Sequence, residues 1–318
     1  MLLGSGVARV IGLWQHPQVL FPYRPPTGLF ASAYYMTAMP NSPPTAKRTA
    51  PLSGKVVVRT LDSNQPFLWL GRAWHDMTRC GWVSVWHGVV MALAGALMLW
   101  LAHDRFWFLA GAFSGFLLVG PVLATSLYAL SAGLERGEKP GFSVVLQTWL
   151  NWQDGRIQPW GEAQWRLVRF GALLALAGTA WVLMSAGLIT WLAPAPIPTP
   201  IAFIEHVVLA KEGWLFETWL LLGGALVAPI FASTVVTIPL LLDRPVAVRQ
   251  AIATSWQVIF ANPVPMAIWG ALIMVLTFVG FATALFGLVL LVPLLGHASW
   301  HAYRDVLDVS GMPEREQN

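Results

Sequence analysis

Charged residues are scarce in this chain, and cysteine is almost absent. Lys, Arg, Asp and Glu make up 11% of the 318 residues, whereas they make up about a quarter of a soluble domain. So few charges cannot cover a soluble protein of this size, and we expect lipid to be the solvent for much of the surface. The single cysteine, Cys80, excludes an intramolecular disulfide and offers no cysteine-based metal site.

The chain also lacks the short motifs that mark common catalytic, cofactor and nucleic-acid sites. It contains no glycine-rich nucleotide-binding loop, no recognisable Ser/His/Asp arrangement and no HExxH-type motif. The net charge of +4 is small, so we expect no nucleic-acid partner. We predict no catalytic residues and no cofactor, and we expect a protein that is not an enzyme.

Apolar and aromatic residues, in contrast, are abundant. Hydrophobic residues make up 56% of the chain, and 18 residues are tryptophan. Many tryptophans lie where a spanning segment would meet water, an interface that amphipathic rings favour. Examples are Trp82, Trp100, Trp107, Trp191 and Trp214. The composition predicts an all-α, multi-pass integral membrane protein that is partnered by the lipid bilayer and by other membrane proteins.

The long apolar segments predict six transmembrane helices, because about 20 apolar residues cross a bilayer. The predicted spans are 82–102, 106–134, 170–192, 214–242, 264–280 and 283–303. Residues 264–295 carry no charge and are too long for one crossing, so this segment is divided near Gly280. Amphipathic segments precede the first, third and fifth spans, and we expect them to lie along the membrane surface.

The first 58 residues differ from the rest of the chain. Prolines recur there among Ser, Thr and Ala without a sustained apolar face, a composition that cannot bury enough surface to offset chain entropy. We predict a disordered N-terminal arm at 1–58, a membrane domain at 59–309 and a short C-terminal tail at 310–318.

A unit of one surface helix and two spans recurs three times, which predicts a threefold internal repeat. The second span of each unit carries a proline and ends at a pair of opposite charges. The prolines are Pro121, Pro229 and Pro293, and the pairs are Glu135-Arg136, Asp243-Arg244 and Arg304-Asp305. In the first two units the pair begins 14 residues after the proline. Because prolines and exit charges are ordinary in membrane helices, coincidence is the alternative.

Several of these motifs resemble one family. The C-terminal ones are Leu242-Asp243-Arg244, Asn262-Pro263, Gly296-His297-Ala298 and residues 300–305, and residues 115–121 and 134–137 match the earlier part. Together they resemble the bacterial predicted integral membrane proteins grouped as domain of unknown function 2189. The resemblance covers residues 67–308 and is loose between 151 and 213. It implies a six-span protein of the bacterial inner membrane and implies no activity.

The distribution of basic residues predicts the orientation of the chain. With six spans, most Lys and Arg near the spans lie on one side, and only Arg105 and Lys211 lie on the other. Because positive charge stays in the cytoplasm, we expect both termini there.

Two histidines, His297 and His301, are four residues apart and therefore share one helical face. They are the candidates for a metal or haem site, which would need a further ligand such as His87, Asp305 or His75. The alternative is that both rings form hydrogen bonds to neighbouring helices or to lipid headgroups at the end of the sixth span. We predict that they lie on the inner face of that span, toward neighbouring helices. The hydroxyls considered as partners are those of Thr277, Thr283, Ser126 and Thr237. In either case we expect Tyr303 and Arg304 at the headgroup level.

The charged ends of the even-numbered spans form a second candidate site, a charged cytoplasmic mouth. Its residues are Glu135, Arg136, Asp243, Arg244, Arg304 and Asp305. Such a ring of charges suits a gate, a headgroup site or a partner site. Alternatively, neighbouring acids and bases neutralise each other and fix the helix ends.

Three functions remain open. The first is a non-enzymatic role in membrane or envelope organisation, or as a partner subunit. The second is transport of a small solute through the charged mouth. The third is binding of a metal or haem by the two histidines.

Overall fold

In the computed structural model, the described residues are 56–102, 107–112, 115, 120, 124–150, 162–210 and 213–312. The chain divides into two units, Met1–Ala50 and Pro51–Asn318, and every described residue belongs to the second. Most of the predicted arm, and the last six residues of the predicted tail, therefore lie outside the described residues.

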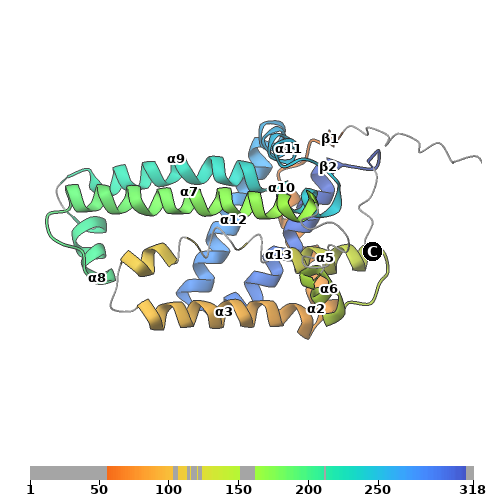
Figure 1. Cartoon of the computed structure of the whole chain (residues 1–318), viewed down its shortest axis with the longest axis horizontal. Helices are drawn as coiled ribbons and strands as arrows, with labels where there is room; N and C mark the ends of the chain where they lie inside the picture. The colour runs from red at the N-terminus through yellow and green to blue at the C-terminus, as the bar shows by residue number, and fades with distance from the viewer. Residues whose placement is uncertain are drawn as a thin grey trace, which may run out of the picture. The chain divides into compact units, whose positions relative to one another are not determined.

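The fold is all-α, as predicted, apart from one antiparallel pair of short strands (Figure 1). The strands are β1 (Val57–Val58) and β2 (Leu307–Asp308). The helices are α2 (Gln65–Cys80), α3 (Trp82–Ala102), α5 (Thr125–Glu135), α6 (Phe142–Leu150), α7 (Glu162–Leu192), α8 (Pro200–Phe203), the π-helix η1 (Ile204–Val208), α9 (Leu215–Thr234), α10 (Thr237–Asp243), α11 (Val248–Ala261), α12 (Pro263–Ala282) and α13 (Leu288–Val306).

Four helical segments of the described chain are long and apolar enough to cross a membrane. They are Trp82–Leu101, Val168–Leu192, Leu215–Asp243 and Pro263–Ala282. They correspond to the predicted first, third, fourth and fifth spans. The predicted second span lies partly outside the described residues. The predicted sixth span corresponds to α13, which carries polar residues in its second half and is not among the four.

The boundaries of two predicted spans differ from the structure. Helix α7 begins at Glu162, inside the polar stretch that we expected to lie along the membrane surface as far as Arg169. The predicted fourth span is broken, because α9 ends at Thr234 and α10 begins at Thr237. Pro239 explains this break: it has no N–H to donate to the carbonyl of Val235 one turn earlier.

The tight turn expected near Gly280 lies slightly later, between the end of α12 at Ala282 and the start of α13 at Leu288. Ala284 and Leu285 adopt positive φ angles of 51° and 71°. The Thr283 hydroxyl oxygen accepts a hydrogen bond of 2.9 Å from the Gly287 N–H. This turn reverses the direction of the chain, and α13 packs against α12.

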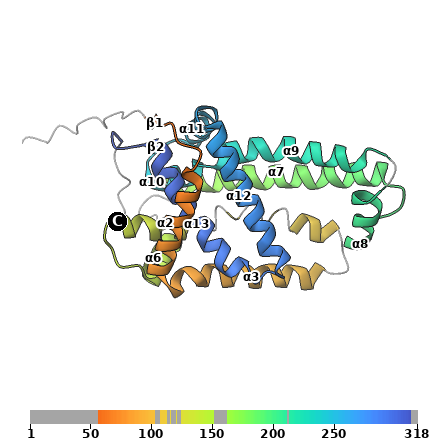
Figure 2. The ribbon, with the colours of Figure 1, turned by 180° about the vertical axis from the view of Figure 1, so that it is seen from behind.

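Helix α13 is the centre of the packing, with α2, α3, α5 and α12 against it. Figure 2 shows α2 lying along α13 while α3 crosses near its beginning. At that crossing a Cβ added to Gly88 would lie 2.1 Å from the backbone oxygen of Val289. The two backbones are therefore in contact, which a residue larger than glycine would prevent.

The start of the described chain is tied into this core. Val57 and Val58 of β1 pair with Asp308 and Leu307, so the last residues of the predicted arm belong to the fold. The Asn262 side chain accepts a hydrogen bond of 2.7 Å from the Leu61 N–H and donates one of 2.9 Å to the Arg59 carbonyl. One amide thus holds the entering strand segment at the junction of α11 and α12.

Helices α7 and α9 lie side by side in both views (Figures 1 and 2). The Trp219 indole N–H donates a hydrogen bond of 2.7 Å to the Ser185 hydroxyl between them. Their outer leucines, such as Leu176 and Leu221, are exposed. An apolar exposed face is what a spanning helix presents to lipid or to another membrane helix.

Candidate functional site

Both predicted histidines lie inside the protein, on the face of α13 that packs against α2, α3 and α5. His297 is fully buried, and His301 is 6% exposed. Their spacing of one helical turn places them on this face together, as the sequence predicts. The structure confirms that the rings face neighbouring helices.

The partners of the histidines are not the predicted hydroxyls. Ser84 of α3 and Ser131 of α5 contact the two nitrogens of His297 at 2.7 Å each. His301 Nε2 lies 2.9 Å from Oδ2 of Asp76, a residue of α2. The expectation of Thr277, Thr283, Ser126 or Thr237 was therefore wrong.

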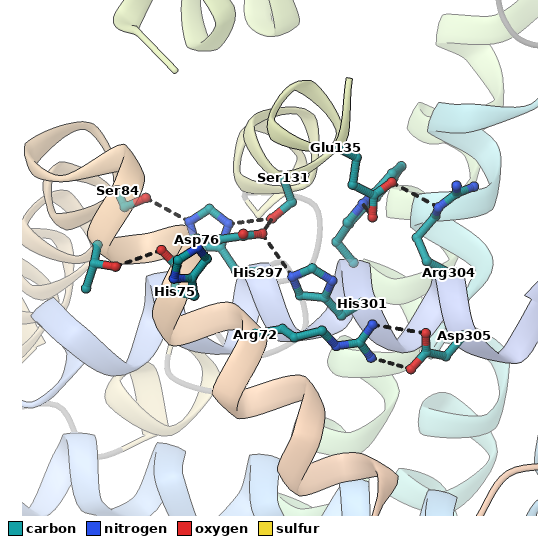
Figure 3. A network of polar contacts seen from close by, with 12 residues as sticks. Arg72, His75, Asp76, Ser84, Ser131, Glu135, His297, His301, Arg304 and Asp305 are labelled. Carbon is teal, nitrogen blue, oxygen red and sulfur yellow. Dashed lines mark hydrogen bonds and ion pairs between the residues drawn. The ribbon is translucent and has the colours of Figure 1, made fainter. Parts of the chain in front are cut away.

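Asp76 is the residue that unites the site, and sequence analysis did not identify it. It lies on the buried face of α2, which also carries Trp69, Ala73 and Cys80. Figure 3 shows its carboxylate between Ser131 and His301. An acid inside the apolar stripe of an amphipathic helix was a signal that could have revealed it.

The direction of the hydrogen bonds follows from counting protons. The Ser131 hydroxyl donates its only proton to Asp76 Oδ2 over 2.7 Å. His297 Nδ1 must therefore donate to the Ser131 oxygen. In a neutral ring the Nε2 of His297 then accepts from the Ser84 hydroxyl. The chain of donors runs from Ser84 through His297 and Ser131 to Asp76, which also accepts from His301.

The electrostatics of Asp76 reflect these partners. Burial opposes ionisation and raises its pKa, but the hydrogen bonds from His301 and Ser131 outweigh this effect. The pKa of Asp76 is consequently held below its ordinary value, so that the carboxylate is ionised at neutral pH. The site is thus a buried anion surrounded by donors.

Of the three further ligands considered for a metal site, two have other partners and one is exposed. His87 donates from Nδ1 to the Val83 carbonyl at 2.8 Å and contacts Ser126 through Nε2 at 2.7 Å. Asp305 binds Arg72, and His75 is exposed. No group of three or more His, Cys, Asp or Glu side chains in the described part of the chain is arranged to hold a metal ion.

The six predicted mouth charges form separate contacts rather than one ring. Arg304 pairs with Glu135 at 3.1 Å, and Arg136 pairs with Glu138 at 2.6 Å. Asp305 accepts from both ends of the Arg72 guanidinium and from the Trp69 indole N–H. Figure 3 shows the Glu135–Arg304 and Arg72–Asp305 pairs close to the buried histidines.

The remaining pair, Asp243 and Arg244, closes the end of α10 against α13. Arg244 contacts Asp243 at 3.0 Å and donates to the Met312 carbonyl at 2.8 Å. The Tyr303 hydroxyl donates to Asp243 at 2.6 Å, and the Tyr303 side chain is fully buried. The Tyr303 hydroxyl thus finds the acceptor it needs on α10, inside the protein. The expected headgroup level of Tyr303 and Arg304 stays a prediction.

Long apolar helices with exposed apolar faces, packed around a buried polar centre, define a multi-pass helical membrane protein. Residues 108–243 match the model of a family described as predicted integral membrane protein (DUF2189). This match confirms the predicted resemblance to that family over residues 108–243. Most of the C-terminal motifs that carry the resemblance lie after the matched range. No curated protein and no solved structure matches the chain.

Proposed function

We propose that this protein is a non-enzymatic component of the bacterial inner membrane, acting in membrane or envelope organisation as the partner subunit of a larger assembly. One observation carries this proposal: the polar atoms at the centre of the bundle satisfy one another. Ser84, Ser131, Asp76 and the two histidines form a continuous network that joins α2, α3 and α5 to α13. A fully satisfied buried network makes a core rigid and specific, which suits a structural role.

The surface of the spans is where such a subunit would meet its partner. Leu176 and Leu183 on α7, and Leu221 on α9, are each about two-thirds exposed or more. Lipid tails are as apolar as leucine, so shape and close packing select a partner for such a face.

Site-specific photo-crosslinking in native membranes tests this proposal. A photoreactive residue at Leu176, Leu183 or Leu221 should yield one reproducible protein adduct, identified by mass spectrometry. The matched control is Leu93 on α3, which is also exposed but belongs to a different helix. If every position gives only lipid adducts, both in isolated membranes and in intact cells, the partner-subunit role is overturned.

The proposal includes six spans with both termini in the cytoplasm. The apolar first half of α13, from Leu288 to Leu295, supports a sixth crossing, and the helical residues 107–112 together with α5 support a second. Reporter fusions at His103, Pro196 and Asn318 test it. A periplasmic signal at Asn318 would contradict six spans.

The order of the helices also supports a threefold repeat. A shorter helix directly precedes a longer one three times: α2 before α3, α6 before α7, and α11 before α12. The charged pairs Glu135-Arg136 and Asp243-Arg244 stand at the ends of α5 and α10, as the repeat requires. Exchanging the loops that join the units, with thermal unfolding as the measurement, tests whether the units are equivalent.

Proton-coupled transport of a small solute is the second candidate, and the placement of Asp76 favours it. Asp76 contacts the imidazole of His301 directly and that of His297 through the Ser131 hydroxyl. Chains of Asp and His inside a membrane bundle are common proton relays. In proteoliposomes with an entrapped pH-sensitive dye, the wild-type protein would move protons when a transported solute is supplied, and Asp76→Asn would not. An equal signal from both proteins would eliminate this candidate.

A further inference from the structure

Helix α2 has an outer face that no described helix covers. Its inner face, which includes Trp69 and Asp76, packs against α13. On the outer face, Phe67 and Trp74 are 56% and 53% exposed. Arg72 and Arg79, seven residues apart, form an exposed basic row along the opposite edge of the same outer face.

The connection to α3 places this outer face at the membrane surface. Helix α2 ends at Cys80, and Gly81, with a φ of 56°, turns the chain directly into α3. The segment Trp82–Leu101 of α3 is a candidate span, so Arg79 stands three residues before the hydrocarbon. Figure 2 shows α2 running across the direction of α3. An amphipathic helix that leads directly into a spanning helix is typical of a position along the bilayer surface.

The charge on this face is not fully compensated by the protein. Arg72 is held by Asp305 in a two-pronged contact. Arg79 is exposed and has no ion-pair partner among the described residues. An uncompensated basic group at the membrane surface is complementary to a lipid phosphate, and exposed aromatic rings on the same outer face suit the interfacial layer.

We propose that the outer face of α2 binds the headgroup of an anionic phospholipid. Arg79 contacts the phosphate, while Trp74 and Phe67 enter the interfacial layer next to the acyl chains. The protein thereby selects the lipid that surrounds its first span. This inference is independent of the partner-subunit role, because it concerns a different surface of the molecule.

Binding of two lipids with identical acyl chains and different headgroups tests the proposal. The full-length protein in a non-ionic detergent is titrated with phosphatidylglycerol or phosphatidylcholine, and bound lipid is measured by native mass spectrometry. We expect tighter binding of phosphatidylglycerol, weakened by added salt. Arg79→Gln should weaken phosphatidylglycerol binding about fivefold and leave phosphatidylcholine binding unchanged.

Arg249→Gln is the matched control, because Arg249 is an exposed arginine of α11, also without an ion-pair partner among the described residues. It should leave the preference intact. Thermal unfolding confirms that both variants are folded, and Trp74→Ala should weaken binding of both lipids. Equal binding of the two lipids by the wild-type protein, or equal losses from Arg79→Gln and Arg249→Gln, would overturn the proposal.

Discussion

Removing the carboxylate of Asp76 should release α2 from the bundle. Asp76 Oδ2 accepts from Ser131 at 2.7 Å and from His301 at 2.9 Å, and both donors are buried. Asp76→Ala leaves both donors without their acceptor. Since each unsatisfied buried group costs about 1–3 kcal/mol, the free energy of unfolding should fall by about 2–6 kcal/mol. Asp76→Asn keeps an acceptor oxygen and loses only the charge, so it should cost roughly 1–2 kcal/mol.

The single cysteine provides a direct assay of this release. Cys80 is buried on α2, one turn after Asp76. Burial raises the pKa of its thiol to about 11, so the thiol is protonated at neutral pH and reacts slowly in the folded protein. A thiol-reactive fluorophore should therefore label Cys80 when heating frees α2.

We expect the temperature of half-labelling to fall in the order wild type, Asp76→Asn, Asp76→Ala. Asp62→Ala is the matched control, because Asp62 is an exposed acid in the turn before α2, and it should behave as wild type. If Asp76→Ala labels at the wild-type temperature, the carboxylate does not hold α2, and the network does not have the structural role proposed for it.

Three further predictions concern the same bundle. Gly88→Ala would place a methyl group against the backbone of α13 and should lower the free energy of unfolding by about 1–3 kcal/mol. Gly224 has open space around it, so Gly224→Ala should have little effect. His301→Leu should cost about 1–3 kcal/mol in unfolding experiments because it leaves Asp76 short of a donor; His301→Gln should cost less, and equal damage from both would favour a metal site. Because the native pKa of Asp76 is lowered, the unfolded state binds more protons in acid, so the unfolding temperature should be constant above about pH 5 and decline below it. Asp76→Asn should make that decline shallower, and an unchanged pH profile would contradict the assignment.

The local features of the fold could be predicted from the sequence. Apolar length predicted the first, third, fourth and fifth spans, and amphipathic spacing predicted α2 and α11 as helices. These features depend on residues within a few turns of one another. The break in the fourth span also has a local cause, Pro239. The predicted repeat used Pro229 instead, because its distance from the charged pair matched that of Pro121. Pro229 is accommodated inside α9 without ending it.

The contacts of the candidate site could not be predicted in the same way. The four-residue spacing of His297 and His301 indicated a shared face, but not which helices lie opposite. Ser84 is 213 residues from His297, and Asp76 is 225 residues from His301. Several other helices also carry hydroxyls, and only the packing around α13 selects Ser84 and Ser131. Likewise, the sequence showed the charged residues at the ends of the spans, but not that Arg304 pairs with Glu135 or that Asp305 pairs with Arg72.

The sequence predicted that α2 lies on the membrane surface and did not reveal its contacts with α13. Its amphipathic pattern is typical of a helix that lies on lipid and equally of a helix that packs on another helix, because both need one apolar face. The second half of α13 decides between them, since His301 and Asp305 in lipid would leave polar groups without partners. Helix α2 provides those partners through Asp76, Arg72 and Trp69. It therefore covers the polar half of α13 with one face while its other face remains available to the bilayer, and the two interpretations of its sequence describe opposite sides of one helix.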